Sequence, residues 1–424
     1  MDFAALLSTL RTGFSRTFWV ANTIELFERF AYYGSKAILA IYVAEQVGLG
    51  PESAGWLVGS LFNTLLYFLP ILAGTVVDRY GFKRSLMACF AIFSVGYFLI
   101  GLAGLPAGQG MVQAVGPKAY MIIALVITAV GGSLIKPSIV GTVARTTTDA
   151  TKSLGYSIYY MLVNLGGAVG PILALQVRHN LGISYVLVMS SLTTFLLFAG
   201  TFLFFKEPPQ PVDAAPRRSM NKVLADMFLV FTNFRFMSFL VIFSGFWMMF
   251  WQIFYALPFY VRDFLKFENF ELNETVDAWT IILITVPATA LAKKLKPIRA
   301  MTVGFGLASV SWFLMGAFPT ITMTVVAIAL FAVGEGIQAP RYYEYVANLA
   351  PQEQVGTYMG FAFLPVAIGT FVAGALGGKL VAHYLQGAGA AAPQHMWYVV
   401  GAIGVVATAL MLFYDRFLAP HHEA

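Results

Sequence analysis

Ionisable side chains gather on one face of an otherwise apolar stretch near the N-terminus. Residues 17–44 contain Glu25, Glu28, Arg29, Tyr32, Tyr33 and Lys36. At about 100° per residue, a helix places all six on one arc of about 140°. Charged side chains that face lipid are costly, so this face must line a cavity or pair internally. The pattern indicates either a transport site or a structural ladder of ion pairs.

The amino-acid composition indicates what surrounds the folded chain. Of its 424 residues, 59% are hydrophobic and 11% are charged, whereas soluble domains carry about 25% charged residues. Hydrocarbon must therefore surround most of the protein. The basic residues lie scattered in short loops, which argues against nucleic-acid binding. Cys89 is the single cysteine, and no metal-ligand cluster, Ser-His-Asp set or phosphate loop is visible, so we expect no enzyme, metal or cofactor.

Hydropathy predicts an all-α membrane protein of twelve transmembrane helices. A spanning helix needs about 20 apolar residues, and such stretches occur at 17–44, 53–77, 85–105, 119–144, 153–177, 182–205, 236–261, 276–292, 298–318, 321–348, 355–380 and 396–418. With both termini in the cytoplasm, 17 Lys and Arg residues lie on the cytoplasmic side and 5 on the outer side. Because cytoplasmic loops are enriched in Lys and Arg, we expect this orientation, in the inner (plasma) membrane.

The spans divide into two groups of six. A Pro- and Arg-rich segment, 206–235, separates residues 1–205 from 236–424 and is predicted to be a cytoplasmic linker. The two groups share a faint repeat, since Ala-Val-Gly followed by proline occurs at 129–137 and again at 332–340. Parallel six-helix repeats are typical of transporters in which one half rocks against the other around a midplane site.

The loop between the second and third spans carries a motif, Gly-x-x-x-Asp-Arg-Tyr-Gly-x-Lys-Arg. It resembles the cytoplasmic loop signature of the major facilitator superfamily, and its motif residues are Gly74, Asp78, Arg79, Gly81 and Arg84. The resemblance implies the major facilitator fold and a loop that latches the two halves in one state. A plain positively charged membrane anchor would explain the basic residues but not the Asp and Gly spacing.

Several segments resemble proton-dependent oligopeptide transporters. The first-span sequence Glu25-x-x-Glu28-Arg29-Phe-x-Tyr-Tyr-Gly is similar to the first-helix signature of that family. Residues 132–138 resemble its fourth-helix segment, in which Lys136 matches an essential lysine. Residues 156–167 resemble its fifth-helix motif, and Gly334-Glu335 resembles its tenth-helix motif.

This resemblance implies how a zwitterionic substrate is held. Arg29, Lys36 and Lys136 would bind a peptide carboxylate, and Glu335 would bind the ammonium group. The implied substrate-binding set is Arg29, Tyr32, Tyr33, Lys36, Tyr67, Lys136, Tyr160, Asn164, Gln252 and Glu335. Proton coupling would use Glu25 or Glu28 beside Arg29 and Lys136, with protons as the coupling ion and no other cofactor.

The sequence also departs from that family. A seventh-helix glutamate that pairs with the first-helix arginine is replaced by Gln252, which cannot carry a proton. The linker at 206–235 is too short for the two extra helices of bacterial members. Near the end of the tenth span, Arg341 and Glu344 have no counterpart, and their i, i+3 spacing predicts that they pair with each other.

We therefore expect a monomeric proton symporter in a lipid bilayer that imports di- or tripeptides, or related small zwitterionic or anionic metabolites. A proton-driven exporter of drugs or metabolites on the same fold is an alternative, favoured by aromatic residues such as Trp247, Trp251 and Tyr255. A channel or receptor without coupling is a third possibility. The two-half repeat and the absence of a sizeable ligand domain argue against it.

Overall fold

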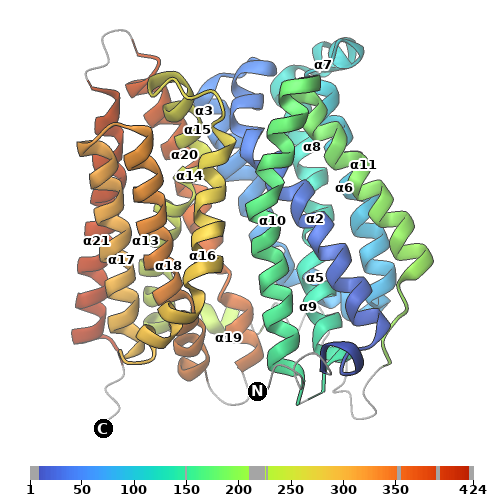
Figure 1. The fold of residues 1–424 in the computed structure, drawn as a ribbon, viewed down its shortest axis with the longest axis vertical. Helices are drawn as coiled ribbons and strands as arrows, with labels where there is room; N and C mark the ends of the chain where they lie inside the picture. Colours follow the sequence, from blue (N-terminus) through green and yellow to red (C-terminus); the bar gives the residue numbers. More distant parts are fainter. Residues whose placement is uncertain are drawn as a thin grey trace. The chain divides into compact units, whose positions relative to one another are not determined.

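The computed structural model describes residues 9–148, 150–209, 225, 228–350, 355–387 and 392–419. Its regular elements in these ranges are helical (Figure 1). Each of the twelve predicted spans coincides with helix, which confirms the all-α fold. The linker predicted at 206–235 lies largely outside the described residues.

The helices of the N-terminal part follow the predicted order. Their bounds are α2 Arg16–Ile41, η1 Tyr42–Gln46, α3 Gly50–Gly55, η2 Trp56–Asn63, α4 Thr64–Phe68, α5 Pro70–Tyr80, α6 Phe82–Ala103, η3 Pro106–Gly108, α7 Gln109–Val115, α8 Pro117–Gly132, α9 Ile135–Thr146, α10 Lys152–Leu181 and α11 Ile183–Phe204. The second span is therefore built from several short helical pieces, and its halves meet at an angle of 40° at Pro70.

The C-terminal part contains the remaining spans. Its helices are α13 Phe234–Phe250, α14 Gln252–Tyr255, α15 Leu257–Phe259, η4 Tyr260–Phe264, α16 Glu271–Ala292, α17 Pro297–Ala317, α18 Ile321–Leu349, α19 Val355–Phe361, α20 Leu364–Tyr384, η6 Pro393–His395 and α21 Met396–Phe417.

Nine helices of the described chain are long and apolar enough to cross a membrane, and the bent pair 50–68 and 70–80 brings the number to ten. The predicted first and eighth spans, α2 and α16, are not among them. The charged residues Glu25, Glu28, Arg29 and Lys36 of α2 account for its absence from this set.

By contacts the described chain forms two compact units. Unit 1 contains residues 9–36 and 69–209, and unit 2 contains residues 37–68 and 225–419. The chain thus passes between units within α2 and at the bend before Pro70. The predicted six-helix halves, 1–205 and 236–424, follow the order of the sequence and remain a prediction.

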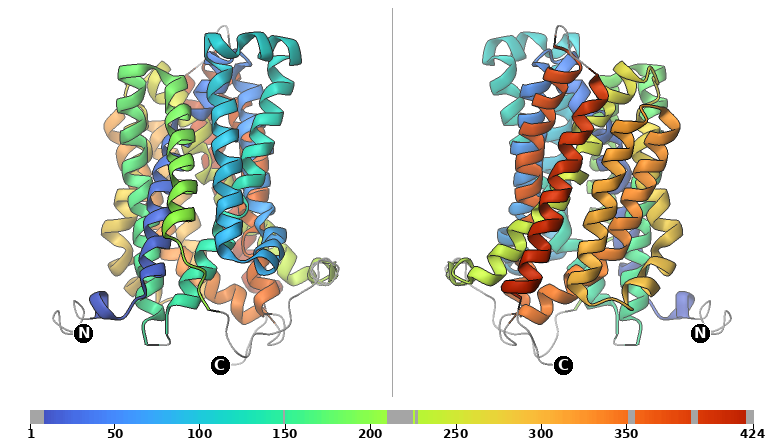
Figure 2. Two further views of the ribbon diagram at one scale, coloured as in Figure 1. Left: turned by 90° about the vertical axis from the view of Figure 1, so that its right-hand side faces the viewer. Right: turned by 90° about the vertical axis from the view of Figure 1, so that its left-hand side faces the viewer.

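Within each unit the long helices pack side by side. In unit 1, α6 contacts both α8 and α11, and in unit 2, α17 contacts both α18 and α21 (Figure 2). Small residues permit the closest approaches, as at Gly96 of α6, where an added Cβ would lie 2.9 Å from Thr128 Cα of α8. Small residues at helix interfaces are how membrane helices gain packing contact in the absence of a hydrophobic driving force.

Candidate functional site

The charged face of α2 forms an ion-pair network in unit 1. Glu25 Oε1 lies 3.4 Å from Arg29 Nε and 3.7 Å from Lys136 Nζ of α9. Glu28 Oε2 accepts a hydrogen bond from Arg29 Nε at 2.5 Å. Arg29 therefore contacts both carboxylates of its own helix, and Lys136 adds a second cation from a different helix.

Tyr159 of α10 completes this network. Its hydroxyl accepts a hydrogen bond from Lys136 Nζ at 3.0 Å and donates to Glu25 Oε1 at 3.4 Å. The phenol thus bridges the lysine and the carboxylate. Tyr159 was not among the predicted site residues. The motif at 156–167 predicted its neighbour, Tyr160, instead.

The carboxylates are deeply buried. Glu25 is 0% exposed, Glu28 is 1% exposed and Arg29 is 6% exposed. Removing charges from water costs several kcal/mol per ion unless they are paired and hydrogen-bonded. The predicted pairing is therefore present, and a transport role for the same residues requires that substrate or conformation can exchange these partners.

Two glycines of α10 bring that helix close to the network. A Cβ at Gly166 would collide with Arg29 Cβ, and a Cβ at Gly170 would lie 2.9 Å from Phe30 O. The i, i+4 spacing places both glycines on one face of α10. This close approach explains locally why the fifth-span motif contains glycine and why Tyr159 reaches Glu25.

The end of the charged face is aromatic. Arg29 Cζ lies 4.8 Å from the ring centroid of Tyr32, and Lys36 Nζ lies 5.3 Å from Tyr32 and 5.5 Å from Tyr33. Cations at these distances from a ring face are attracted by its quadrupole. The structure thus brings together the six residues predicted on this face of α2, either directly or through one neighbour.

Tyr160 and Asn164 are placed differently. Tyr160 is 57% exposed, and Asn164 Nδ2 donates to Tyr160 O of the same helix at 2.9 Å. Both lie on α10 but outside the ion-pair network. Their predicted contact with substrate remains a prediction.

The other candidates, Tyr67, Gln252 and Glu335, belong to unit 2. The ring centroids of Tyr67 and Trp251 are 5.5 Å apart. Gln252 is fully buried, and its Nε2 donates to Ala373 O at 3.1 Å. Glu335 is partly buried on α18. Gln252 therefore fixes α14 to α20, a packing role that the sequence did not predict.

A polar cluster next to these residues joins the second span to α20. Asn63 Nδ2 donates to Tyr255 Oη at 2.6 Å, and Tyr255 Oη is 2.5 Å from Thr370 Oγ1. Ser60 Oγ donates to Phe371 O at 2.5 Å. All of these groups are in unit 2. They hold the hairpin formed by residues 37–68 against that unit.

The predicted gate loop contains a sharp turn. Gly81 has φ +84°, a conformation that favours glycine. Glu207, beyond α11, accepts from the backbone N–H groups of Phe82 at 2.8 Å and Lys83 at 2.7 Å. An anion at these groups satisfies the unpaired donors at the start of α6. Glu207 was not among the predicted site residues, because nothing in its local sequence marks it.

The remaining loop residues make fewer contacts. Asp78 and Arg84 are exposed, Arg79 Cζ lies 5.6 Å from the Tyr80 ring centroid, and a Cβ at Gly74 would meet no described atom within 4 Å. The predicted latch between halves thus remains a prediction.

The predicted Arg341–Glu344 pair of α18 is confirmed at 2.5 Å, and Arg341 Nη2 also donates to Leu295 O at 2.6 Å.

Comparison with known sequences agrees with these features. The sequence model of the Major Facilitator Superfamily matches residues 23–276 and 269–423. A di-/tripeptide transporter of Lactococcus lactis subsp. lactis (strain IL1403) is 26% identical over 223 residues, covering 49% of this chain and 42% of the relative. Dipeptide and tripeptide permease A of Escherichia coli (strain K12) is 29% identical over 215 residues, covering 49% of this chain and 41% of the relative. The match thus spans less than half the length of these relatives.

A third relative matches along most of its length. Multidrug resistance protein MdtH of Sodalis glossinidius (strain morsitans) is 23% identical over 391 residues, covering 91% of this chain and 90% of the relative.

Solved structures show the same fold. A POT family transporter in complex with a thioalcohol-conjugated peptide superposes with a TM-score of 0.77 at 18% identity, covering 95% of this chain and 97% of that one. A POT family transporter in complex with 5-aminolevulinic acid gives a TM-score of 0.77 at 17% identity, covering 95% and 97%. These structures confirm the predicted fold, and the sequence matches above agree with the resemblance inferred from the motifs.

Proposed function

The chain belongs to the major facilitator superfamily, and on this premise we propose that it is a proton-coupled symporter that imports di- or tripeptides, or a related small zwitterionic or anionic metabolite. Membership places the chain among multi-pass membrane transporters rather than enzymes, as the composition predicted. The observation that carries the proposal is the buried network of Glu25, Glu28, Arg29, Lys136 and Tyr159.

The network combines the two properties that coupled transport requires. Lys136 and Arg29 are cations that a substrate carboxylate could engage in place of Glu25. When a carboxylate loses its cationic partner inside a low-dielectric site, its neutral form becomes favoured, so it takes up a proton. Substrate binding and proton uptake would therefore be linked through exchange of partners on the same residues.

The family resemblance also implies a ligand for the ammonium group of the substrate. Glu335 supplies a carboxylate for an ammonium group, while Gln252 supplies only an amide. Because Gln252 cannot titrate, the proposed coupling rests on Glu25 and Glu28 alone. Protons are the proposed coupling ion, and no other cofactor is proposed.

We further propose the topology predicted from charge. Both termini face the cytoplasm of a cell whose inner membrane holds the protein, because 17 basic residues fall on that side and 5 on the other. The proposed functional unit is a monomer in the lipid bilayer.

The exporter alternative is favoured by one observation. The multidrug resistance relative matches over 90% of its own length, whereas the peptide permeases match over about two fifths of theirs. The direction of transport and the identity of the substrate must therefore be tested together.

The decisive experiment uses purified protein in liposomes with an inward proton gradient and a pH dye inside. Addition of di- and tripeptides outside should acidify the lumen faster than empty liposomes do. Acidification that no peptide accelerates would contradict peptide symport. Extrusion of preloaded cationic dyes under the same inward proton gradient would instead support the exporter, because an antiporter couples proton entry to dye exit.

A further inference from the structure

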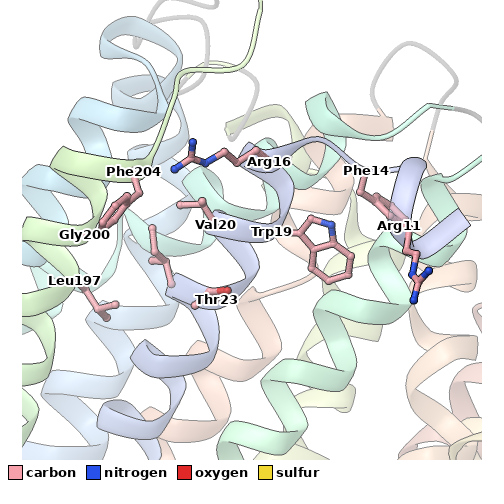
Figure 3. A pocket seen from close by; sticks show the side chains of 10 residues that line it. Arg11, Phe14, Arg16, Trp19, Val20, Thr23, Leu197, Gly200 and Phe204 are labelled. Carbon is pink, nitrogen blue, oxygen red and sulfur yellow. The ribbon is translucent and has the colours of Figure 1, made fainter. Parts of the chain in front are cut away.

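A groove opens at the end of unit 1 where α2 begins. It has a volume of about 560 Å³ and is lined by Arg11, Phe14, Arg16, Trp19, Val20, Thr23, Ile24, Leu197, Gly200 and Phe204. The lining residues come from α2, from the chain just before it, and from α11. Figure 3 shows Arg16 extending from α2 toward Phe204 of α11. None of these residues belongs to the ion-pair network.

The chemistry of the groove changes along its length. Arg11 and Arg16 are both exposed and lie toward the chain terminus. Further along α2 and α11, the lining becomes aliphatic and aromatic, with Val20, Leu197 and Phe204. The lining contains two cationic side chains and no acidic one. A ligand that matches this arrangement is an amphiphile with an anionic head and an apolar tail.

Trp19 marks the depth of this groove in the membrane. Its side chain is 38% exposed and lies between the arginines and the apolar residues in sequence. Tryptophan is enriched where lipid headgroups meet hydrocarbon. Basic pockets between transmembrane helices at this level are suited to anionic lipid headgroups.

A glycine keeps the apolar part of the groove open. An added Cβ at Gly200 would meet no described atom within 4 Å, so the space above it is unfilled by side chains. Leu197, Gly200 and Phe204 follow each other at i, i+3 and i+7 and so line one face of α11. Seven residues of helix extend about 10 Å, which is enough for the first part of an acyl chain.

We propose that this groove binds one anionic phospholipid, with its phosphate at Arg16, which extends toward Phe204, and its acyl chain over Gly200. In the proposed orientation, this lipid belongs to the cytoplasmic leaflet. The bound lipid tethers the start of α2 to α11, and the lining of the groove ends at Ile24, one residue before Glu25. The proposal is independent of which substrate is carried.

Binding is tested with the full-length protein in detergent, by counting co-purified lipid with native mass spectrometry after titration with phosphatidylglycerol. Phosphatidylcholine and glycerol 3-phosphate are titrated in parallel, the latter as a soluble phosphate without a tail. We expect phosphatidylglycerol to bind selectively. Arg16→Gln should weaken its binding about fivefold, since one basic residue near the membrane surface contributes about 1 kcal/mol. Arg11→Gln should weaken it less, because Figure 3 shows Arg11 pointing away from Arg16 and Phe204.

The Gly200→Leu variant tests the apolar part while leaving both arginines intact. Leucine should occupy the groove and lower phosphatidylglycerol binding at least as much as the arginine changes. Gly306→Leu is the matched control, because a Cβ at Gly306 of α17 also meets no described atom within 4 Å. It should leave binding unchanged.

A second measurement uses the unmodified chain as its reference. Phosphatidylglycerol with brominated acyl chains should quench the fluorescence of Trp19. The Trp19 signal is the difference between the unmodified chain and a Trp19→Phe variant, which retains the other six of seven tryptophans. Quenching confined to those other tryptophans would overturn the proposal. So would equal binding of phosphatidylcholine, equal binding of glycerol 3-phosphate, or full binding by Gly200→Leu.

Discussion

Arg262 pairs with Glu45 through both terminal nitrogens of its guanidinium group, and the Nη1–Oε2 distance is 2.9 Å. The two residues lie in similar elements, because η1 and η4 both begin with Tyr-Val and both are turns of π-helix. The pair therefore joins the ends of the first and seventh predicted spans. Both residues belong to unit 2.

This pair should contribute little to stability. Glu45 is 44% exposed and Arg262 is 24% exposed, so water screens their attraction. In a double-mutant cycle of Glu45→Gln and Arg262→Gln, we expect a coupling energy of about 0.2–1 kcal/mol in the unfolding free energy. The Arg341–Glu344 pair, in which Glu344 is 45% exposed, provides a comparison cycle. A coupling of several kcal/mol would contradict this expectation and point to a desolvated pair.

The hairpin at 37–68 should depend on glycine far more than on this ion pair. A Cβ at Gly374 of α20 would lie 2.5 Å from Gly55 O and 2.5 Å from Ser60 N. Because these neighbours are backbone atoms, they cannot move aside easily. We expect Gly374→Ala to lower stability by about 1–3 kcal/mol, as overpacking does. Thermal unfolding in detergent measures the effect.

Gly306→Ala is the control for this change, since its Cβ meets no described atom within 4 Å. The control should unfold near the wild-type temperature. If both variants were equally stable, the backbone contact between α20 and the hairpin would not be a determinant of stability.

The spans were predictable because hydrocarbon imposes a simple rule on sequence. Each needs about 20 apolar residues, and all twelve predicted stretches are helical. Interruptions within spans were not predictable in this way. The π-helical turns at 56–63 and 260–264 and the break at Ser133 and Leu134 between α8 and α9 alter neither length nor hydropathy.

The site was predictable where charge had to be buried. Glu25, Glu28 and Arg29 stand out because ionisable residues are expensive in a membrane helix. Tyr159 and Glu207 do not stand out, since a tyrosine is common in spans and a glutamate is common beyond their ends. Their roles depend on which helix packs beside them, which spacing along one chain does not reveal.

Tyr159 offers a test of the network that keeps every charge. Tyr159→Phe removes the hydroxyl that lies 3.0 Å from Lys136 Nζ and 3.4 Å from Glu25 Oε1. Hydrogen bonds to charged groups contribute about 1.5–3 kcal/mol. We therefore expect peptide uptake to fall about tenfold or more, measured as the initial rate in liposomes. Tyr160→Phe, at the exposed neighbour, should be less than threefold slower. Equal uptake by both variants would remove Tyr159 from the proposed mechanism.

A substitution at Glu28 tests which carboxylate of the network carries the proton. Glu28 Oε2 is 2.5 Å from Arg29 Nε and the side chain is 1% exposed. Glu28→Gln keeps the shape but cannot release a proton. We expect loss of gradient-driven accumulation with retention of peptide counterflow, because exchange needs no net proton movement. Accumulation at the wild-type level would exclude Glu28 as the coupling residue and leave Glu25.

Lys136 is the cation that the network shares between helices, and its removal should be the most damaging single change. Lys136→Ala leaves Glu25 with only Arg29 among the cations of the network and removes the proposed carboxylate ligand. We expect peptide uptake and counterflow both to be abolished. Stability should fall by less than the about 3–5 kcal/mol typical of a broken buried pair, because the lysine side chain is 32% exposed. Thermal unfolding of the same sample separates loss of transport from loss of fold, and Lys152→Ala, at an exposed lysine where α10 begins, is the control. Normal uptake by a folded Lys136→Ala variant would refute the substrate-binding role proposed for this residue.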